Sequence, residues 1–384
     1  MSIDADTIKR WATDPKGPVA LHLKQSLTSV ECIDPAKDRC IIYPPTYADI
    51  GYNIDELSDG TKVALVDSVG SQANRLEPSF ICPDSDQSKW LVPQIKIKIN
   101  DDMSLSLLDL AHRGADAVVR SSGTLATKID DAFQELRKSG NASKLCAIAP
   151  TSLLFGAWDS RGSNEKLPRL VRSIIRAWDV EVLHSAAQFN SVWKALNDEQ
   201  KKELEKEAKN QKVKLSVKGF ADAPGVFRNT KIPQIKEDTY NPDARVLGGV
   251  LVKGGIERDI TINLVALRGL SAPSDNETLQ LRSYLLSLAL LAATTDIDLF
   301  LREGCNLRFV GEDEWRAVPR KGEPKQIDLH SEAAKRVIKD FAEESAKPYR
   351  AQWEYAIGEE MEFTFDLKSA KELLKKKTEE DAPD

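Results

Sequence analysis

The stretch VLGGVLVKGGIERDITINLVAL, residues 246–267, contains two apolar and β-branched runs separated by paired glycines. Such runs are typical of β-strands, and Gly254 and Gly255 predict the turn of a β-hairpin between them. The apolar segment that follows, residues 277–294, predicts a buried helix. A hairpin followed by a buried helix favours an antiparallel sheet with helices packed on one face.

The same pattern continues outward from this stretch. Alternating or continuous apolar runs predict strands at residues 62–68, 95–100, 145–150, 212–219 and 307–310. Helical spacing predicts helices at residues 68–77, 106–122, from about 168, at 191–210 and twice near the C-terminus. The interleaved order predicts an α+β fold. We expect an irregular N-terminal extension (1–60), a core (61–310) with an insertion at about 190–245, and a C-terminal helical extension (311–384) ending in an acidic tail.

Composition excludes several classes of protein. The 384 residues carry a formal net charge of −6, so a globally basic nucleic-acid-binding protein is excluded. No apolar run reaches the roughly 20 residues of a membrane span, and no phosphate-binding loop or dinucleotide fingerprint is present. Five scattered cysteines and four dispersed histidines predict reduced thiols, a cytoplasmic protein, and neither metal nor cofactor.

The charge is nevertheless segregated along the chain. Residues 161–176 carry a net +4 and residues 212–236 a net +5, which leaves −15 on the remainder. Arg169, Arg172 and Arg176 follow one side of the helix expected from residue 168, about 5 Å apart per turn, and so could track a phosphate backbone. The alternative is an ordinary solvated helix face. Arg161 and Lys166 lie in the preceding loop, a candidate anion cradle.

Three further groups of residues could carry function. Lys218 and Arg228 belong to the second basic segment, which is either an RNA-binding hairpin or a mobile charged loop. Residues 68–77 are rich in hydroxyl and amide donors, suited to sugar and phosphate contacts or to a capped surface helix. His112 could act as a general acid or base, but no partner lies nearby in sequence, which favours a structural role. Trp158 and Trp178 are expected in the core, and the alternative is that they are stacking platforms.

Three segments together resemble one known family. They are LVDSVGSQANRLE (65–77), DLAHRGADAVVRSS (109–122) and PTSLLFGAWDSRG (150–162), extended by residues 167–183 and by GGVLVKGG (248–255). In this order and spacing they are similar to the repeat-associated (RAMP) backbone subunit of the type I-G, formerly I-U, CRISPR surveillance complex (Cascade). The resemblance runs from about residue 65 to 268.

The resemblance implies an RRM-like, ferredoxin-type core with a thumb loop. It further implies a non-catalytic subunit that polymerises head to tail along the crRNA guide and grips phosphates and riboses without reading sequence. The implied partners are the crRNA, target DNA through the guide, further copies of the chain, other Cascade subunits and a recruited nuclease-helicase. No membrane is involved.

Motif position and helix faces together give the expected RNA-binding residues: Gln72, Asn74, Arg75, Arg113, Arg120, Arg161, Lys166, Arg169, Arg172, Arg176, Lys218 and Arg228. No catalytic residue is expected. Two alternatives remain open at this point. One is a metal-independent endoribonuclease of the same superfamily that processes crRNA precursor with His112, and the other is an oligomeric scaffold that never contacts nucleic acid.

Overall fold

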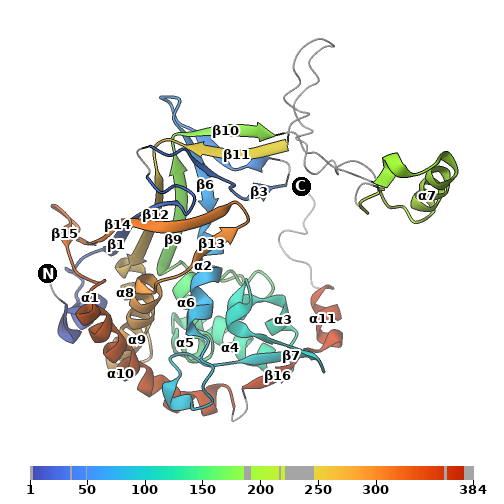
Figure 1. Cartoon of the computed structure of the whole chain (residues 1–384). Coiled ribbons are helices and arrows are strands. Elements are labelled where there is room, and N and C mark those ends of the chain that lie inside the picture. The colour runs from blue at the N-terminus through green and yellow to red at the C-terminus, as the bar shows by residue number, and fades with distance from the viewer. Residues whose placement is uncertain are drawn as a thin grey trace.

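The computed structural model describes residues 3–34, 37–48, 50–185, 192–215, 218–220, 246–358 and 361–375. Its central feature is an eight-stranded antiparallel sheet (Figure 1). In spatial order the strands are β13 (Leu299–Arg302), β14 (Cys305–Val318), β1 (Ala20–Ser29), β12 (Ile256–Asn263), β9 (Val171–Trp178), β6 (Lys62–Asp67) and β5 (Ile54–Glu56), and β15 (Lys325–Gln326) pairs with β14. The expected α+β class is confirmed.

Two chain connections carry helices onto the same side of this sheet. The first runs from β1 to β9 through α2 (Val69–Leu76), α3 (Ala117–Arg120), α4 (Gly123–Ser139), α5 (Ser143–Ile148) and α6 (Pro150–Phe155), with 3-10 turns η1 (Glu77–Phe80), η2 (Gln87–Lys89), η3 (Leu107–Asp109) and η4 (Arg113–Ala115). The second runs from β12 to β14 through α8 (Leu264–Gly269) and α9 (Asp275–Thr294). The four strands β14, β1, β12 and β9 therefore form two split βαβ units.

One face of the sheet is buried along its whole length, because alternate residues of each strand point inward. At one end Leu21, Leu23 and Ile260 pack against the helices. At the other end Ile175 and Ile256 pack against a second, smaller sheet. That sheet contains β10 (Val180–Ser185), β11 (Val246–Val252) and β2 (Cys40–Ile42), and Figure 1 shows it at the opposite end of the large sheet from the helices.

The two strands expected at 246–267 are confirmed, but they do not form a hairpin with each other. β11 pairs with β10 in the small sheet, whereas β12 pairs with β9 and β1 in the large one. The glycines mark the bend where a long ribbon passes between the sheets. Gly254 donates to the carbonyl of Trp178, and Gly255 adopts a positive φ of 95° that favours glycine.

The N-terminal segment is not the irregular extension that its prolines predict. It contains α1 (Ala5–Thr13) and β1, and β1 pairs with both β12 and β14 in the middle of the large sheet. Two short strands, β3 (Thr46–Tyr47) and β4 (Gly51–Tyr52), pair nearby. The expected boundary at residue 60 therefore separates strands of one sheet.

The C-terminal helices are confirmed as α10 (Glu332–Ala356), which packs against α9, and α11 (Leu367–Leu373). The strand expected at residues 95–100 is β7 (Lys96–Asn100), which lies between β8 (Met103–Ser106) and β16 (Glu362–Thr364). The polar helix is confirmed as α7 (Asp198–Asn210), preceded by η5 (Val192–Ala195). The acidic tail lies outside the described residues.

Four predicted elements are wrong. Residues 171–178 form strand β9 instead of a helix, since their β-branched side chains alternate between the two faces. Residues 143–148 form helix α5 instead of a strand. Residues 106–122 form short turns around Gly114 and the four-residue helix α3. The described residues of 212–219 form turns and no strand.

Candidate nucleic-acid interface

The three segments that carry the resemblance meet in space beside β6 and β9. Arg113 Nε lies 2.7 Å from Oε2 of Glu77, and Arg120 lies 2.5 Å from Oδ1 of Asp159. The amide of Gly114 donates to Oγ of Ser152 at 3.1 Å. Each of these contacts joins two different segments, so the segments fold into one unit.

Glu77 and Arg113 form a buried ion pair at the centre of this unit. Arg113 also donates to the carbonyl of Gly156, lies over the ring of Phe155 and adopts a left-handed backbone with φ of 55°. Burial raises the pKa of Glu77 to about 7, although the neighbouring guanidinium lowers it. Burial also lowers the pKa of Arg113. The pair therefore links residues 65–77 to residues 109–122 inside the fold.

Arg120 and Asp159 hold the loop that follows α6. Asp159 is fully buried and accepts hydrogen bonds from the amide and hydroxyl of Ser163 at 2.6 and 2.8 Å. Gly162 lies so close that a Cβ there would meet Asp159 Oδ2 at 2.7 Å. The amides of residues 162, 163 and 164 all donate to Asp159. The expected anion cradle is therefore wrong in two respects, because these amides are engaged within the loop and a strand follows it.

A second buried network lies under the sheet. Gln72 donates to Asp67 at 2.7 Å and accepts from Ser173 and Arg258 at 2.7 and 2.9 Å. Arg258 also donates to Gln25 on β1, and burial lowers its pKa to about 10. These side chains join α2 to the four neighbouring strands β6, β9, β12 and β1, so the network determines where α2 lies.

Three residues expected to contact RNA are buried instead. Gln72, Arg113 and Arg120 are 0%, 4% and 9% exposed, and each one is bonded to other parts of the chain. Arg75 is half-buried and bonds to Asp67 and to the carbonyl of Leu301. Sequence reasoning assigned these groups to the surface because it did not pair them with Glu77, Asp159 and Asp67, which they contact in the fold. Those acidic residues position the surrounding elements, and sequence reasoning missed them.

Four expected residues lie at the surface around the same unit. Asn74 is exposed and accepts from Arg113 at 3.3 Å. Arg169 is exposed, lies beside Gly156 and lowers the pKa of Arg113 through its charge. Lys166 is exposed and Arg161 half-buried, both in the loop that Asp159 organises. Trp158, which we expected in the core, is 38% exposed there.

Arg172 and Arg176 lie on the outer face of β9, which points away from both cores. They are four positions apart along the strand, which corresponds to about 13 Å. Their cross-strand neighbours are Thr261 and Glu257. Lys24 bonds to Glu257 at 2.8 Å, and His22 lies 3.4 Å from Asp259.

Two side chains of β1, Lys24 and His22, thus contact the carboxylates of Glu257 and Asp259 on this outer face. In the part of the chain that the structure describes, neither Arg172 nor Arg176 has a carboxylate within ion-pair distance. The hydrogen bond from His22 is the main cause that lowers the pKa of Asp259. The expected row of three arginines is therefore wrong, because Arg169 belongs to the loop surface and the other two belong to the sheet.

The structure separates the expected RNA-binding residues into two exposed groups and one buried group. The loop group contains Asn74, Arg161, Lys166 and Arg169, and the sheet group contains Arg172 and Arg176. Lys218 is exposed in the short described stretch 218–220, and Arg228 lies outside the described residues.

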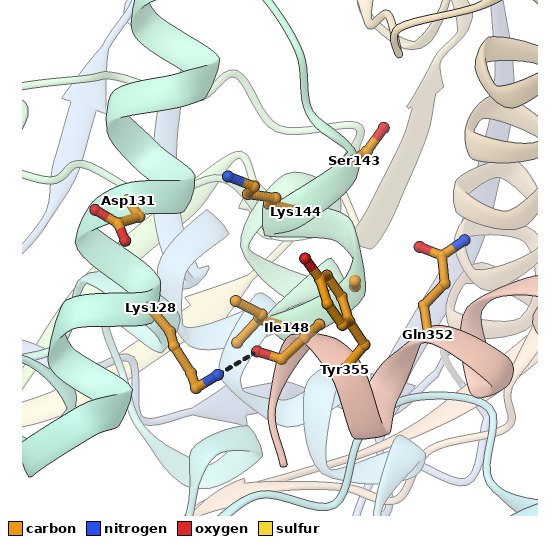
Figure 2. A pocket seen from close by; sticks show the side chains of 9 residues that line it. Lys128, Asp131, Ser143, Lys144, Ile148, Gln352 and Tyr355 are labelled. Carbon is orange, nitrogen blue, oxygen red and sulfur yellow. Dashed lines mark hydrogen bonds between the residues drawn. The ribbon is translucent and has the colours of Figure 1, made fainter.

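Two further features of the molecule are His112 and a cavity. His112 is 66% exposed, with Nδ1 3.3 Å from Oδ2 of Asp116. A cavity of about 420 Å³ lies between α4, α5 and α10, where Lys128 donates to the carbonyl of Ala356 beside the exposed ring of Tyr355 (Figure 2). None of the expected RNA-binding residues lines it.

Among the residues that the structure describes, no group of three or more His, Cys, Asp or Glu side chains is placed to hold a metal ion. Among the same residues, no helix has the length and apolar character required to cross a membrane.

Comparison with known protein families gives a match to part of the chain. Residues 31–182 match the model of a family described as CRISPR-associated protein GSU0053. The match indicates a CRISPR-associated (Cas) protein family. The matched range, less than half of the chain, includes all three segments that meet around Glu77 and Asp159 and ends after β9 in β10. No curated protein matches the chain.

Proposed function

We propose that this chain is a non-catalytic RAMP backbone subunit of a type I-G CRISPR effector complex, which binds the sugar-phosphate backbone of the crRNA guide. The family match suggests a role in CRISPR defence. In this proposal the subunit polymerises along the guide and presents its bases for pairing with target DNA.

The observation that carries the proposal is the position of Arg172 and Arg176 on the outer face of a central strand, where no carboxylate of the described residues lies within ion-pair distance of either guanidinium. The strand order β14–β1–β12–β9, with two split βαβ units, supports an RRM-like core. RRM-type modules bind RNA on the exposed face of such a sheet.

The chemistry of the two exposed groups favours binding without sequence preference. Guanidinium and ammonium groups contact phosphate oxygens, which carry no sequence information. Arg169 and Lys166 are exposed on the loop between α6 and β9, so the segment that leads into the strand of Arg172 and Arg176 also carries positive charge. Buried pairs such as Arg120–Asp159 hold this loop in place, which reduces the cost of ordering it on binding.

Segregated charge supports assembly with further copies. The two basic segments carry a net +9 against −15 on the remainder, so a basic surface of one copy could face an acidic surface of the next. A head-to-tail interface is heterologous and extends a filament instead of closing a dimer. The remaining proposed partners are other Cascade subunits and a recruited nuclease-helicase.

The test replaces both sheet arginines with glutamate, Arg172→Glu and Arg176→Glu, in the chain coexpressed with a guide. We expect the RNA that co-purifies, measured as the ratio of absorbance at 260 and 280 nm, to fall to the level of free protein. The matched control is Arg336→Glu with Lys339→Glu on α10, which makes the same charge change at exposed positions away from the sheet face. Equal loss of RNA in both double variants would show a general charge effect and contradict the proposal.

Salt dependence gives an independent measurement. The logarithm of the affinity for a single strand should fall with the logarithm of salt concentration, with a slope near −0.7 per phosphate neutralised. The double sheet variant should have a shallower slope than the α10 control.

The ribonuclease alternative is not favoured. His112 is exposed and contacts the carboxylate of Asp116. If the alternative held, purified protein would cleave crRNA precursor and the variant His112→Ala would not. We expect intact precursor after incubation with either protein.

A further inference from the structure

We infer that Trp158 is a stacking platform for one base of the bound strand, with Lys166 and Arg161 beside it as phosphate contacts. This inference rests on the proposed function and adds to it a site for a base. It concerns a position that the sequence pattern placed in the core.

The indole of Trp158 is exposed but held in place. Its Nε1 donates to Oδ1 of Asn164 at 3.0 Å. Its backbone pairs with Lys166 in an antiparallel bridge. The next residue, Asp159, is fully buried and accepts the amide of Ser163. The ring therefore has little rotamer freedom left to lose when a ligand stacks on it.

One face of the ring already attracts a cation. The ammonium of Lys166 lies 4.5 Å from the ring centroid. Trp158 as a whole residue remains 38% exposed, so it is accessible to a partner at the surface. Every nucleobase has a π face, and a base stacked on an aromatic ring contributes binding that tolerates any sequence. The site is therefore consistent with a strand held without base readout.

The surroundings favour a nucleic-acid strand over an uncharged partner. Arg161 and Lys166 lie within the same loop, and Arg169 follows it. Against them the loop carries the half-buried Glu165, while the carboxylate of Asp159 is buried and paired with Arg120. A rigid aromatic ring followed in its loop by three cations is an arrangement that can stack a base and contact its neighbouring phosphates.

The experiment compares two strands that differ only in their bases. Fluorescein-labelled oligoadenylate and an abasic ribose-phosphate strand of equal length are titrated with wild type and with Trp158→Ala, and fluorescence anisotropy is followed at one salt concentration. We expect the variant to bind oligoadenylate roughly five- to 150-fold more weakly, the range for loss of one stacked aromatic. Affinity for the abasic strand should change less than twofold.

Two further variants are matched controls. Trp158→Phe keeps an aromatic ring and should retain most of the affinity for oligoadenylate. Phe300→Ala removes another exposed aromatic ring, on β13, and should change neither affinity. Circular dichroism of each variant checks that the fold is kept.

Other outcomes would overturn the inference. Equal weakening on both strands would mean that Trp158 supports the loop without stacking a base. Unchanged RNA binding with loss of self-association would assign Trp158 to a contact between protein copies. If wild type binds neither strand, the proposed function fails as well. If wild type binds both strands and Trp158→Ala changes nothing, only the stacking site fails.

Discussion

The buried carboxyl of Glu77 gives the sharpest test of the scaffold, because burial and its partner Arg113 act on its pKa in opposite directions. Burial prevails and raises the pKa to about 7 from an ordinary value of 4.5. The folded state therefore binds a proton more tightly than the unfolded state does. Between pH 5 and 8 the folded protein releases that proton, so stability must fall as pH rises through this window.

The magnitude follows from the same two values. A rise from 4.5 to about 7 corresponds to about 3 kcal/mol of stability, present at low pH and lost above pH 7. The variant Glu77→Gln keeps the shape of the side chain and removes the titration. Other groups titrate equally in both proteins and cancel in the difference. Part of this stability is already lost at pH 5, so relative to Glu77→Gln, wild type should be about 2.5 kcal/mol less stable at pH 8 than it is at pH 5.

The assay is urea unfolding followed by tryptophan fluorescence at pH 5, 6, 7 and 8. The matched control is Glu323→Gln, which makes the same substitution at an exposed carboxyl. If wild type instead gains stability relative to Glu77→Gln as pH rises, Arg113 prevails over burial and the reasoning is wrong. A flat difference would show that the carboxyl does not titrate in this range.

Three further predictions concern the same unit and its core. Arg120→Met leaves the buried carboxylate of Asp159 without its guanidinium and should cost about 3–5 kcal/mol of unfolding free energy in urea, since a broken buried pair retains an uncompensated charge. Gly162→Ala forces a Cβ against Asp159 and should cost about 1–3 kcal/mol, whereas Gly269→Ala, with no atom within 4 Å of its Cβ, should be neutral. Burial raises the pKa of the Cys146 thiol, so Cys146 should react with Ellman's reagent only after the protein unfolds, as peptide mapping of the labelled protein would reveal.

Local sequence patterns predicted an element correctly where the spacing of its apolar residues fits either a helix or a strand, but not both. KIKIN and KVALVD alternate or run apolar over strand lengths, and both are strands. VRSIIRAW fits both periods, because its apolar residues satisfy a helical stripe and its alternate residues also satisfy a buried strand face. Pairing with β12 and β6 decides between the two, and that pairing is long-range information.

The candidate site was predicted in part for the same reason. The sequence identified the segments that meet, and exposed residues such as Arg169 and Arg172 lie at the surface as expected. It could not reveal that Arg113 finds Glu77 thirty-six positions earlier in the chain, or that Arg120 finds Asp159. A charged residue is assigned to the surface unless its partner is known, and the partner depends on tertiary contacts.

The cations of this chain therefore belong to two physical classes with separable consequences. Arg113, Arg120 and Arg258 are buried, and each one lies against polar or acidic groups that hold α2, the loop after α6 and the strands together. Arg169 and Arg172 are exposed on the elements that those groups position. Loss of a buried cation should lower stability and affect binding only through the fold, whereas loss of an exposed cation should weaken binding and leave the unfolding free energy nearly unchanged. If the proposed interface is correct, stability and affinity measured across both classes will be uncorrelated, since the residues that order the surface are distinct from those that contact the strand.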